Sequence, residues 1–342
     1  MELIFLGTGS ATPTYERNVA ALAIKRERET LLFDCGESTQ HQIIRSSLRR
    51  SRIRKIFITH LHGDHFYGLI GLLTSYQLNK REDPLELFGP PGIADYIKFM
   101  KRISETDFAY PLQVHELKVD REPETILETA EYMIEAVRVR HRIYTMAYSL
   151  VEKPRPGRLD AALATEMNIP EGPERRLLKD GHDITLEDGR LVTSSELVAP
   201  PLPGRKIAYI TDTTYTPSSV VLAKEADILI HESTYDNDDR KNARRTQHST
   251  VGDAVRVAQE AGAKLLLLTH ISSRYLNRGT VIQDQVEELL PGSLLANDLM
   301  HVTLPASGSP EVMYRYRRNG GNGRNGDSPS KPRKKKVSGK EL

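Results

Sequence analysis

The sequence contains one cysteine and no tryptophan among its 342 residues. A single cysteine excludes an intrachain disulfide, so we expect Cys35 to be a packed thiol in a reducing, cytoplasmic compartment. No apolar run is long enough to cross a bilayer, and we therefore expect no membrane partner. Residues 1–6 lack the charged segment and the length of a signal peptide, and they are typical of a first strand instead.

A short segment is rich in metal-ligand side chains: His60, His62, Asp64 and His65. His60 and His62 are two residues apart in an extended segment, so both project to the same side and can reach one ion. Asp64 and His65 point elsewhere and could serve a second ion about 3.5–4 Å away. A His-rich surface loop without metal is the alternative, but the apolar run 56–58 indicates a buried strand that holds the loop in place. The pattern indicates a metallohydrolase.

Three further polar residues each follow an apolar run directly: His141, Asp212 and His270. Taken singly, each is more typical of a turn residue or a satisfied polar group. In α/β sheets, however, sites gather beyond the carboxyl ends of the strands, so the recurrence predicts that these segments converge. A catalytic zinc ion uses about three protein ligands, and these residues could complete two sets.

Longer motifs carry a resemblance to a known family. The run His60–His65 matches the His-x-His-x-Asp-His signature of the metallo-β-lactamase superfamily. A narrower resemblance rests on Leu-Gly-Thr-Gly-Ser at 6–10, Phe-Asp-Cys-Gly-Glu at 33–37, His-Glu-Ser-Thr at 231–234 and Thr-His-Ile-Ser-Ser-Arg-Tyr at 269–275. Over roughly residues 1–310 the sequence resembles ribonuclease Z, the tRNA 3′-processing endonuclease family of that superfamily.

The resemblance implies an α/β fold, an αβ/βα four-layer sandwich with a protruding flexible arm, over a catalytic domain at 1–310. It also implies two Zn²⁺ ions per subunit, although Mn²⁺ or Fe²⁺ would suit the same donors. The implied ligands are, for the first ion, His60, His62 and His141, for the second, Asp64, His65 and His270, and, bridging both, Asp212.

Three residues take catalytic roles by the same resemblance. Asp64 is the proton acceptor, His248 is our candidate proton donor to the leaving group, and Glu232 orients His248. The local sequence also allows His248 to mark the start of a helix, because Thr250 and Asp253 fit a capping box, and both interpretations can hold together. His231 could be either structural or a support for the site.

Seventy residues separate His141 from Asp212, and metal binding requires none of them. The insertion 154–205 is dense in Pro and Gly, which argues against a continuous core element, although residues 159–167 have helical spacing. It resembles the family's arm, which grips the tRNA elbow far from the cut; a solvated insertion without function is the alternative. The resemblance makes three basic residues candidate phosphate contacts: Arg175, Arg176 and Lys179.

The sequence departs from the family's usual pattern at three positions. Ser38 stands where glycine is frequent, Ile70 where proline is common, and Thr211 where glycine commonly precedes the bridging aspartate. We expect none of them to touch a proposed ligand. They are expected to alter loop shape and thereby substrate preference.

Charge is divided unevenly along the chain. Residues 315–342 hold ten Lys or Arg against two Asp or Glu, a net of +8, so the rest of this +2 chain sums to −6. The basic segment is also rich in Gly, Asn, Ser and Pro, and we expect it to be disordered. Two interpretations stay open: a weak, salt-sensitive affinity for RNA, and a tail that only improves solubility.

The sequence thus predicts an endoribonuclease that cuts precursor tRNA 3′ of the discriminator nucleotide, leaving a tRNA 3′-hydroxyl and a trailer 5′-phosphate. Family resemblance adds a homodimer in which the arm of one subunit holds tRNA for the site of the other. One alternative is a phosphodiesterase of the same fold that acts on small or other RNA substrates. Another is an RNA-binding protein that has lost turnover, which the complete ligand set argues against. Discrimination against precursors with encoded CCA, exonuclease activity and the metal loaded in the cell are left open.

Overall fold

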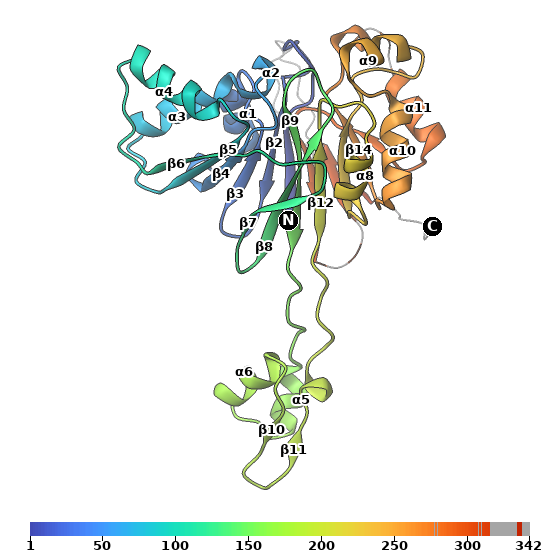
Figure 1. Ribbon diagram of the computed structural model, residues 1–342. Helices are drawn as coiled ribbons and strands as arrows, with labels where there is room; N and C mark the ends of the chain where they lie inside the picture. Colours follow the sequence, from blue (N-terminus) through green and yellow to red (C-terminus); the bar gives the residue numbers. More distant parts are fainter. Residues whose placement is uncertain (277, 279, 307, 309, 315–333, 337–342) are drawn as a thin grey trace, which may run out of the picture. The chain divides into compact units, whose positions relative to one another are not determined.

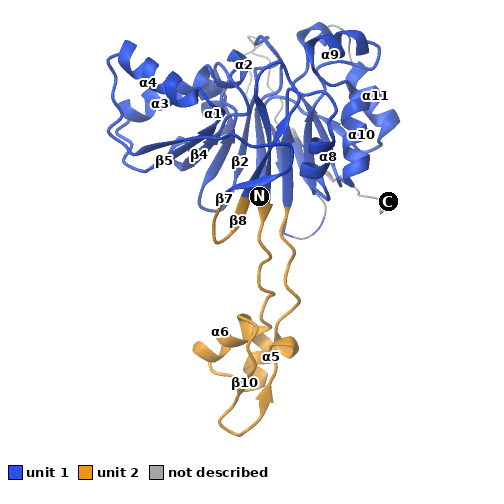
Figure 2. Cartoon of the chain, in the orientation of Figure 1, with its two compact units in different colours: residues 1–127, 134–150, 206–342 blue, residues 128–133, 151–205 orange. Residues whose placement is uncertain are grey.

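The computed structural model describes residues 1–276, 278, 280–306, 308, 310–314 and 334–336 (Figure 1). The chain divides into two compact units (Figure 2). We call residues 1–127, 134–150 and 206–342 the body, and residues 128–133 and 151–205 the arm.

One sheet of the body has nine strands in the order β18-β17-β16-β1-β2-β3-β4-β5-β6. Neighbours from β3 to β6 run parallel, whereas β1 pairs antiparallel with both β2 and β16. The strands span Glu2–Gly7 (β1), Ala21–Lys25 (β2), Thr30–Phe33 (β3), Ile53–Phe57 (β4), Leu85–Gly89 (β5), Leu112–Glu116 (β6), Met300–Thr303 (β16), Glu311–Tyr314 (β17) and Lys334–Lys336 (β18).

The second sheet has seven strands in the order β15-β14-β13-β12-β9-β8-β7. Strands β12 to β15 are parallel, with Ile210 opposite His231 and Glu232 opposite Thr269. This register brings the carboxyl ends of β12, β13 and β14 to one edge of the sheet. The bounds are Glu124–Glu128 (β7), Tyr132–Val139 (β8), Thr145–Glu152 (β9), Lys206–Ile210 (β12), Ile228–Glu232 (β13), Leu266–Thr269 (β14) and Leu294–Leu295 (β15).

Helices cover the outer face of each sheet (Figure 1). On the first sheet, α1 (Thr39–Ser46), α3 (Gly68–Leu78) and α4 (Ile93–Ile103) pack through Ile43, Leu72 and Ile97. On the second, α8 (Pro217–Ala223), α10 (Val251–Ala261) and α11 (Val281–Leu289) pack through Leu222, Val255 and Val286. Short elements complete the body: 3₁₀ turns at Arg50–Arg52 and Ser273–Tyr275, α2 at Gly63–Phe66 and α9 at Arg240–Thr246.

Aromatic rings fill the space between the two sheets. Phe57 of β4 stacks on Phe33 and Phe88 with centroids 5.0 and 4.9 Å apart. Tyr148 of β9 and Tyr209 of β12 reach Phe33 from the opposite sheet, at 6.0 Å each. Large buried rings of this kind are favourable in tilted contact, so they join the two sheets. The expected αβ/βα four-layer sandwich is confirmed.

The arm has a small core of its own, formed by six buried side chains: Ala164, Ile169, Leu178, Ile184, Val192 and Leu197. Asp160 caps its first helix by accepting a hydrogen bond from the Leu163 N–H at 2.9 Å. Two antiparallel bridges, Arg155–Leu202 and Leu159–Val198, pair the chain segments that enter and leave the arm. Its elements are α5 (Ala161–Glu166), α6 (Pro173–Lys179), β10 (Ile184–Thr185), β11 (Leu191–Val192) and α7 (Ser194–Leu197).

Three sequence expectations bear on the rest of the chain. Cys35 is fully buried, as expected, and burial raises the pKa of its thiol to about 12. Among the described residues, none of the helices has the length and apolar character that a membrane crossing requires. Within the segment expected to be disordered, the described residues Lys334–Lys336 form β18, paired antiparallel with β17. Residues 315–333 and 337–342 lie outside the described residues, so the expectation for this segment stays a prediction.

Candidate metal centre

Seven predicted ligands meet at one edge of the body, where the strands of both sheets end. The loop after β4 and the short helix α2 carry His60, His62, Asp64 and His65, and the ends of β8, β12 and β14 supply His141, Asp212 and His270. Asp212 and His270 have positive φ angles of 47° and 59°. Non-glycine residues in this region cost conformational energy, and such strain gathers at functional sites.

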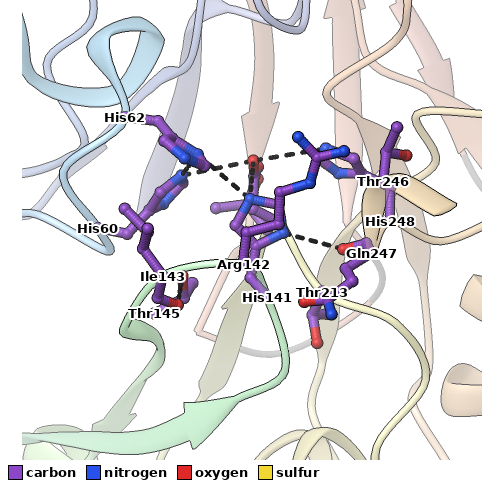
Figure 3. A network of polar contacts seen from close by, with 12 residues as sticks. His60, His62, His141, Arg142, Ile143, Thr145, Thr213, Thr246, Gln247 and His248 are labelled. Atoms are coloured by element: carbon purple, nitrogen blue, oxygen red, sulfur yellow. Dashed lines mark hydrogen bonds and ion pairs between the residues drawn. The ribbon is translucent and has the colours of Figure 1, made fainter. Parts of the chain in front are cut away.

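The first group of donor atoms comes from three imidazoles. His60 Nε2 lies 3.1 Å from His62 Nδ1, which lies 3.2 Å from His141 Nε2. Figure 3 shows the three rings turned toward one another. Asp212 Oδ2 completes the group at 3.5 Å from His60 and 3.7 Å from His141.

The second group is built around His65 Nε2. This atom lies 3.2 Å from His270 Nε2 and 3.5 Å from Asp64 Oδ2. Asp212 Oδ1 lies 3.2 Å from His65 and 3.1 Å from His270. The two oxygens of Asp212 therefore face different groups, which is the arrangement expected of a carboxylate shared by two ions.

These spacings fit zinc. Tetrahedral ligand atoms about 2.0–2.1 Å from one ion lie about 3.3 Å from each other. The distances within both groups scatter around that value, from 3.1 to 3.7 Å. Five imidazoles, two carboxylates and a buried setting suit a borderline ion such as Zn²⁺, and also Mn²⁺ or Fe²⁺.

The charge state of the groups agrees with cation binding. Burial lowers the pKa of His60 to about 4 and also lowers the pKa of His62 and His141, so these imidazoles keep free lone pairs at neutral pH. For Asp212, burial raises the pKa, but the surrounding imidazoles outweigh it and hold the pKa well below its usual range. Burial lowers the pKa of His65, but the carboxylates of Asp212, Asp64 and Asp34 outweigh it and raise that pKa well above its usual range, so this place stabilises positive charge.

His248 and Glu232 form a pair beside the metal groups. His248 Nδ1 donates to Glu232 Oε1 at 2.9 Å, while Nε2 lies 4.0 Å from Asp212 Oδ2. Glu232 is fully buried and also accepts from the N–H groups of Thr213, at 2.7 Å, and Thr234, at 3.1 Å. Burial lowers the pKa of His248, but the carboxylates of Glu232 and Asp212 outweigh it and raise that pKa to about 9. The helix-start interpretation of this segment also holds, because Thr250 and Asp253 form a capping box on α10.

Several supporting residues were not assigned a role from the sequence. Asp34, which follows β3, accepts hydrogen bonds from His65 Nδ1 at 2.8 Å, from the Thr59 N–H at 2.8 Å and from Tyr209 Oη at 3.1 Å. Thr234 Oγ1 contacts His270 Nδ1 at 3.0 Å. Asp34 was detectable, because it follows an apolar strand just as Asp212 does. The threonines and the tyrosine carry no comparable signal in one sequence.

The Thr211 expectation is wrong. Its hydroxyl donates to Asp212 Oδ1 at 2.8 Å, so this departure from the family pattern does touch a proposed ligand. Ser38 adopts a left-handed conformation with φ 61°, which explains why glycine suits the position. Ile70 lies within α3, where its neighbour Leu69 is buried.

His231 does not join the ligand groups. It is fully buried, its Nδ1 donates to the Glu232 carbonyl oxygen at 2.7 Å, and burial lowers its pKa. Its second nitrogen, Nε2, has no hydrogen-bond partner among the described residues. These contacts favour the structural interpretation of His231.

A pocket of about 630 Å³ opens over the two metal groups. Its wall includes residues 10–13, Tyr67, Thr246 and two cationic side chains, Arg142 and Arg274. The backbone N–H of Ala11 donates to Asp64 Oδ2 at 2.8 Å, which fixes one rim against the metal groups. The pocket is large enough for a nucleotide-sized portion of a substrate.

Comparisons with known proteins agree with this geometry. Residues 29–271 match the family model described as the beta-lactamase superfamily domain. A ribonuclease Z from Cyanothece sp. is 43% identical over 317 residues, covering 91% of this chain and 98% of the relative. A ribonuclease Z from Bacillus subtilis is 41% identical over 309 residues, covering 89% and 99%.

A solved structure is also similar to this chain in its fold. The crystal structure of the short form of human tRNase Z is 30% identical, has a TM-score of 0.65, and is matched over 89% of this chain and 100% of its own length. The range matched by the family model, residues 29–271, includes all seven proposed ligands. The chain therefore belongs to the ribonuclease Z family, the endoribonucleases of the beta-lactamase superfamily.

Proposed function

We propose that this protein removes the 3′ trailer from precursor tRNA by zinc-dependent hydrolysis, cutting 3′ of the discriminator nucleotide. The observation that carries the proposal is Asp212, whose two oxygens face two separate groups of donors beneath one pocket. The single buried cysteine supports placing this activity in the cytoplasm.

His60, His62, His141 and Asp212 would hold one ion, and Asp64, His65 and His270, together with the other oxygen of Asp212, would hold the second. When bound, the pair supplies Lewis-acid stabilisation of the phosphoryl oxygens and makes an activated water available at neutral pH.

The chain's own residues account for the proton transfers. The attacking water adds to phosphorus while the bond from phosphorus to the 3′ oxygen breaks, which leaves a tRNA 3′-hydroxyl and a trailer 5′-phosphate. Asp64 accepts a proton from the water, and its Oδ2 is held in place by the Ala11 N–H. His248 gives a proton from Nε2 to the departing 3′ oxygen, because Glu232 holds the opposite nitrogen and favours the protonated ring.

The arm supports the choice of tRNA as substrate. Arg176 is 84% exposed on α6, and Lys179 at its end is also exposed. Arg175 differs from expectation, since its guanidinium donates to the Ile169 carbonyl oxygen at 2.8 and 3.0 Å and its side chain is only 14% exposed. These contacts favour a structural role for Arg175 within the arm, and its role as a phosphate contact stays a prediction.

Arg155 is a further cation available to a phosphate. Its Nε and Nη2 are buried and have no hydrogen-bond partner among the described residues. Together with Lys179 it lines a cavity of about 810 Å³ within the arm, beside the hydroxyls of Thr193 and Ser195. Unpaired guanidinium groups favour an anionic ligand, and the phosphates of a folded RNA supply one.

Exposed apolar side chains on the body support a homodimer. Ile44 of α1, Tyr67 before α3 and Leu78 at the end of α3 are 64%, 61% and 77% exposed, and α1 packs against α3. Large apolar side chains in such positions are typical of protein interfaces. Light scattering coupled to gel filtration tests the dimer, and a monomeric mass at micromolar concentration would contradict it.

Mapping of product ends tests the function directly. The zinc-loaded protein is incubated with a 3′-labelled precursor tRNA, and we expect a single cut after the discriminator. An intact tRNA beside rapid hydrolysis of bis(p-nitrophenyl) phosphate would favour a small-substrate phosphodiesterase. Absence of both activities at full metal occupancy would favour an RNA-binding protein without turnover.

Replacement of the arm tests its role separately. Deleting residues 158–180 alone would leave Ile184, Val192 and Leu197 without their core partners. We therefore replace residues 156–201 by a short Gly-Ser turn that joins Arg155 to Leu202, which already pair in an antiparallel bridge. Precursor tRNA should bind at least about tenfold more weakly, because several phosphate contacts are lost. Hydrolysis of the small phosphodiester should be retained; equal loss of both would assign the arm to folding.

Mixing two defective subunits tests whether the arm acts across the dimer. One subunit has Asp212→Ala and an intact arm, and the other has an intact site and the arm replacement. We expect the mixture to regain part of the cleavage that each lacks alone. A mixture that forms dimers and stays inactive would show that each arm serves its own site.

A further inference from the structure

One short helix beside the pocket concentrates positive charge. α9 carries Arg240, Lys241, Arg244 and Arg245 in seven residues, and all four are exposed. Residues 1–314 together have a net charge of −6, so this helix stands out against its surroundings. Cations near a helix C-terminus also interact well with the helix dipole, but the first-turn residues Arg240 and Lys241 gain nothing from that effect.

The position of α9 is fixed by the catalytic segment itself. The helix ends at Thr246, and Gln247, with φ 58°, turns the chain into His248. The Gln247 carbonyl oxygen accepts from His141 Nδ1 at 2.9 Å, which ties the end of α9 to a proposed ligand. In Figure 1, α9 lies at the same edge of the sheets as α2, the helix that carries Asp64 and His65.

Two more cations connect α9 to the pocket wall. Arg142 donates to the Arg245 carbonyl oxygen at 3.4 Å, and Figure 3 shows its guanidinium group on the side of Thr246 and His248. Arg274 pairs with Asp239 at 2.6 Å, directly before α9, and both arginines line the pocket. Arg142 therefore carries positive charge from the pocket wall to the end of the helix, while Arg274 compensates the carboxylate of Asp239.

Three acidic residues precede α9, and two of them are engaged by other groups; the third, Asp238, is exposed and leaves one carboxylate against the four cations of α9. The Asp239 carboxylate is engaged by Arg274 and by the Tyr275 hydroxyl at 3.2 Å. Asp236 is buried and lies 3.7 Å from Arg278. Within the described part of the chain, none of the ion pairs involves a cation of α9. Exposed, unpaired and densely spaced cations are the surface that a polyanion binds.

We propose that α9 binds backbone phosphates of the RNA strand next to the cleaved bond, and so forms an RNA interface separate from the arm. The proposal rests on the proposed function, and it adds a surface that positions the strand over the pocket. RNA is the partner that fits, because the surface adjoins the site where the RNA is cut. Its cations are separate exposed side chains along a helix, which suit a chain of phosphates better than a single bound anion. These phosphates belong either to the acceptor stem or to the trailer.

Paired neutral substitutions test the surface. The variant Arg240→Gln with Arg244→Gln removes two charges at i and i+4, and Lys241→Gln with Arg245→Gln removes the other two. Lys98→Gln with Arg102→Gln is the matched control, because these exposed cations have the same spacing on α4. Unfolding temperatures identify any variant that fails to fold. If one of the two α9 variants does not fold, the other is used for the measurements.

The measurements are binding of labelled precursor tRNA and its cleavage, both at several salt concentrations. A plot of the logarithm of the binding constant against the logarithm of the salt concentration should be less steep for the variant, by about 1.8, because two phosphate contacts are lost. The ratio of the wild-type to the variant binding constant therefore falls roughly tenfold when the salt concentration rises fourfold. Turnover of bis(p-nitrophenyl) phosphate should not change. Precursors with trailers of one and of twenty nucleotides distinguish the two sources of phosphate. If the α9 substitutions weaken binding only of the precursor with the longer trailer, α9 contacts the trailer; if they weaken binding of both, it contacts the acceptor stem.

Two outcomes would overturn the inference. If both α9 pairs keep the wild-type salt slope with every precursor, or weaken binding no more than the α4 control, α9 does not bind RNA. Failure of the wild-type protein to cut precursor tRNA would instead overturn the proposed function, so the two failures are distinguishable.

Discussion

Asp34 Oδ2 accepts a hydrogen bond from His65 Nδ1 at 2.8 Å, and both side chains are fully buried. Because Nδ1 carries the proton, Nε2 is the nitrogen that faces Asp212 and His270. Asp34 thereby sets both the tautomer and the ring orientation of His65. Its own position is fixed by the Thr59 hydroxyl at 3.0 Å. The carboxylate is thus a positioning group for a proposed metal ligand.

Asp34→Asn should weaken metal binding. The amide keeps the shape of the side chain but turns one acceptor oxygen into a donor, so it no longer holds His65 and Thr59 together. We expect zinc affinity and turnover to fall about 10- to 100-fold. Zinc titration against a competing chelator measures the affinity. Asp95→Asn on α4 is the control, since Asp95 is exposed; equal affinity in the two variants would remove the positioning role.

Asp212→Ala should abolish cleavage. The substitution removes the one carboxylate shared by both donor groups, and several kcal/mol of transition-state stabilisation corresponds to a loss of at least about a thousandfold. Zinc content measured by mass spectrometry should fall as well. Retained activity at normal zinc content would overturn the assignment of Asp212 as the bridging ligand.

Thr211→Val should lower turnover, because it removes the hydroxyl that donates to Asp212 Oδ1 at 2.8 Å. A lost contact to a metal ligand typically costs about 10-fold or more in affinity or activity. Thr211→Ser keeps the hydroxyl and serves as the control, with turnover near wild type. The same loss in both variants would point to packing of the threonine methyl group instead.

Family resemblance was sufficient to predict the sandwich, and the seven proposed ligands could be named from the sequence for identifiable reasons. Buried parallel strands such as β12 to β14 read as apolar runs, and the polar residue after each run lies at the shared edge of the sheet. Asp212 and His270 could be picked out in this way. The ligand roles themselves came from family resemblance, and they stay predictions until metal is measured.

Other features depended on contacts that one sequence does not encode. The position of Arg175 in a helix predicts an exposed cation, yet its guanidinium donates a hydrogen bond to the Ile169 carbonyl oxygen inside the arm. Thr211 gave no sign of its hydrogen bond to Asp212, because the direction of a side chain at a strand end depends on the turn that follows. The charge on α9 is visible in the sequence, but its nearness to the pocket appears only when β13 and α10 are placed.

Ser38→Gly should stabilise the protein. Ser38 has φ 61° and makes no capping hydrogen bond with its side chain, so it bears the left-handed cost without compensation. Relief of that cost, less the greater unfolded-state entropy of glycine, leaves about 0.5–1 kcal/mol. Urea unfolding measures the gain. Ser75→Gly within α3 is the control and should lose about 0.5–1 kcal/mol, since glycine weakens a helix interior.

Glu232→Gln should move the alkaline limit of RNA cleavage to lower pH. His248 must be protonated to serve the leaving group, so activity is present below its pKa and is lost as the pH rises through it. Burial lowers that pKa, and the Glu232 carboxylate is the strongest group that raises it. Removing this negative charge therefore lowers the pKa, by about one unit or more. The pH profile of single-turnover cleavage of precursor tRNA measures the shift.

The leaving group supplies the internal control for this variant. p-Nitrophenolate departs without a proton donor, so the profile for bis(p-nitrophenyl) phosphate should stay in place while the RNA profile moves. Glu82→Gln, at an exposed position before β5, should move neither profile. A shift with both substrates would mean that Glu232 acts on the metal groups as a whole, and an unchanged RNA profile would remove His248 as the proton donor.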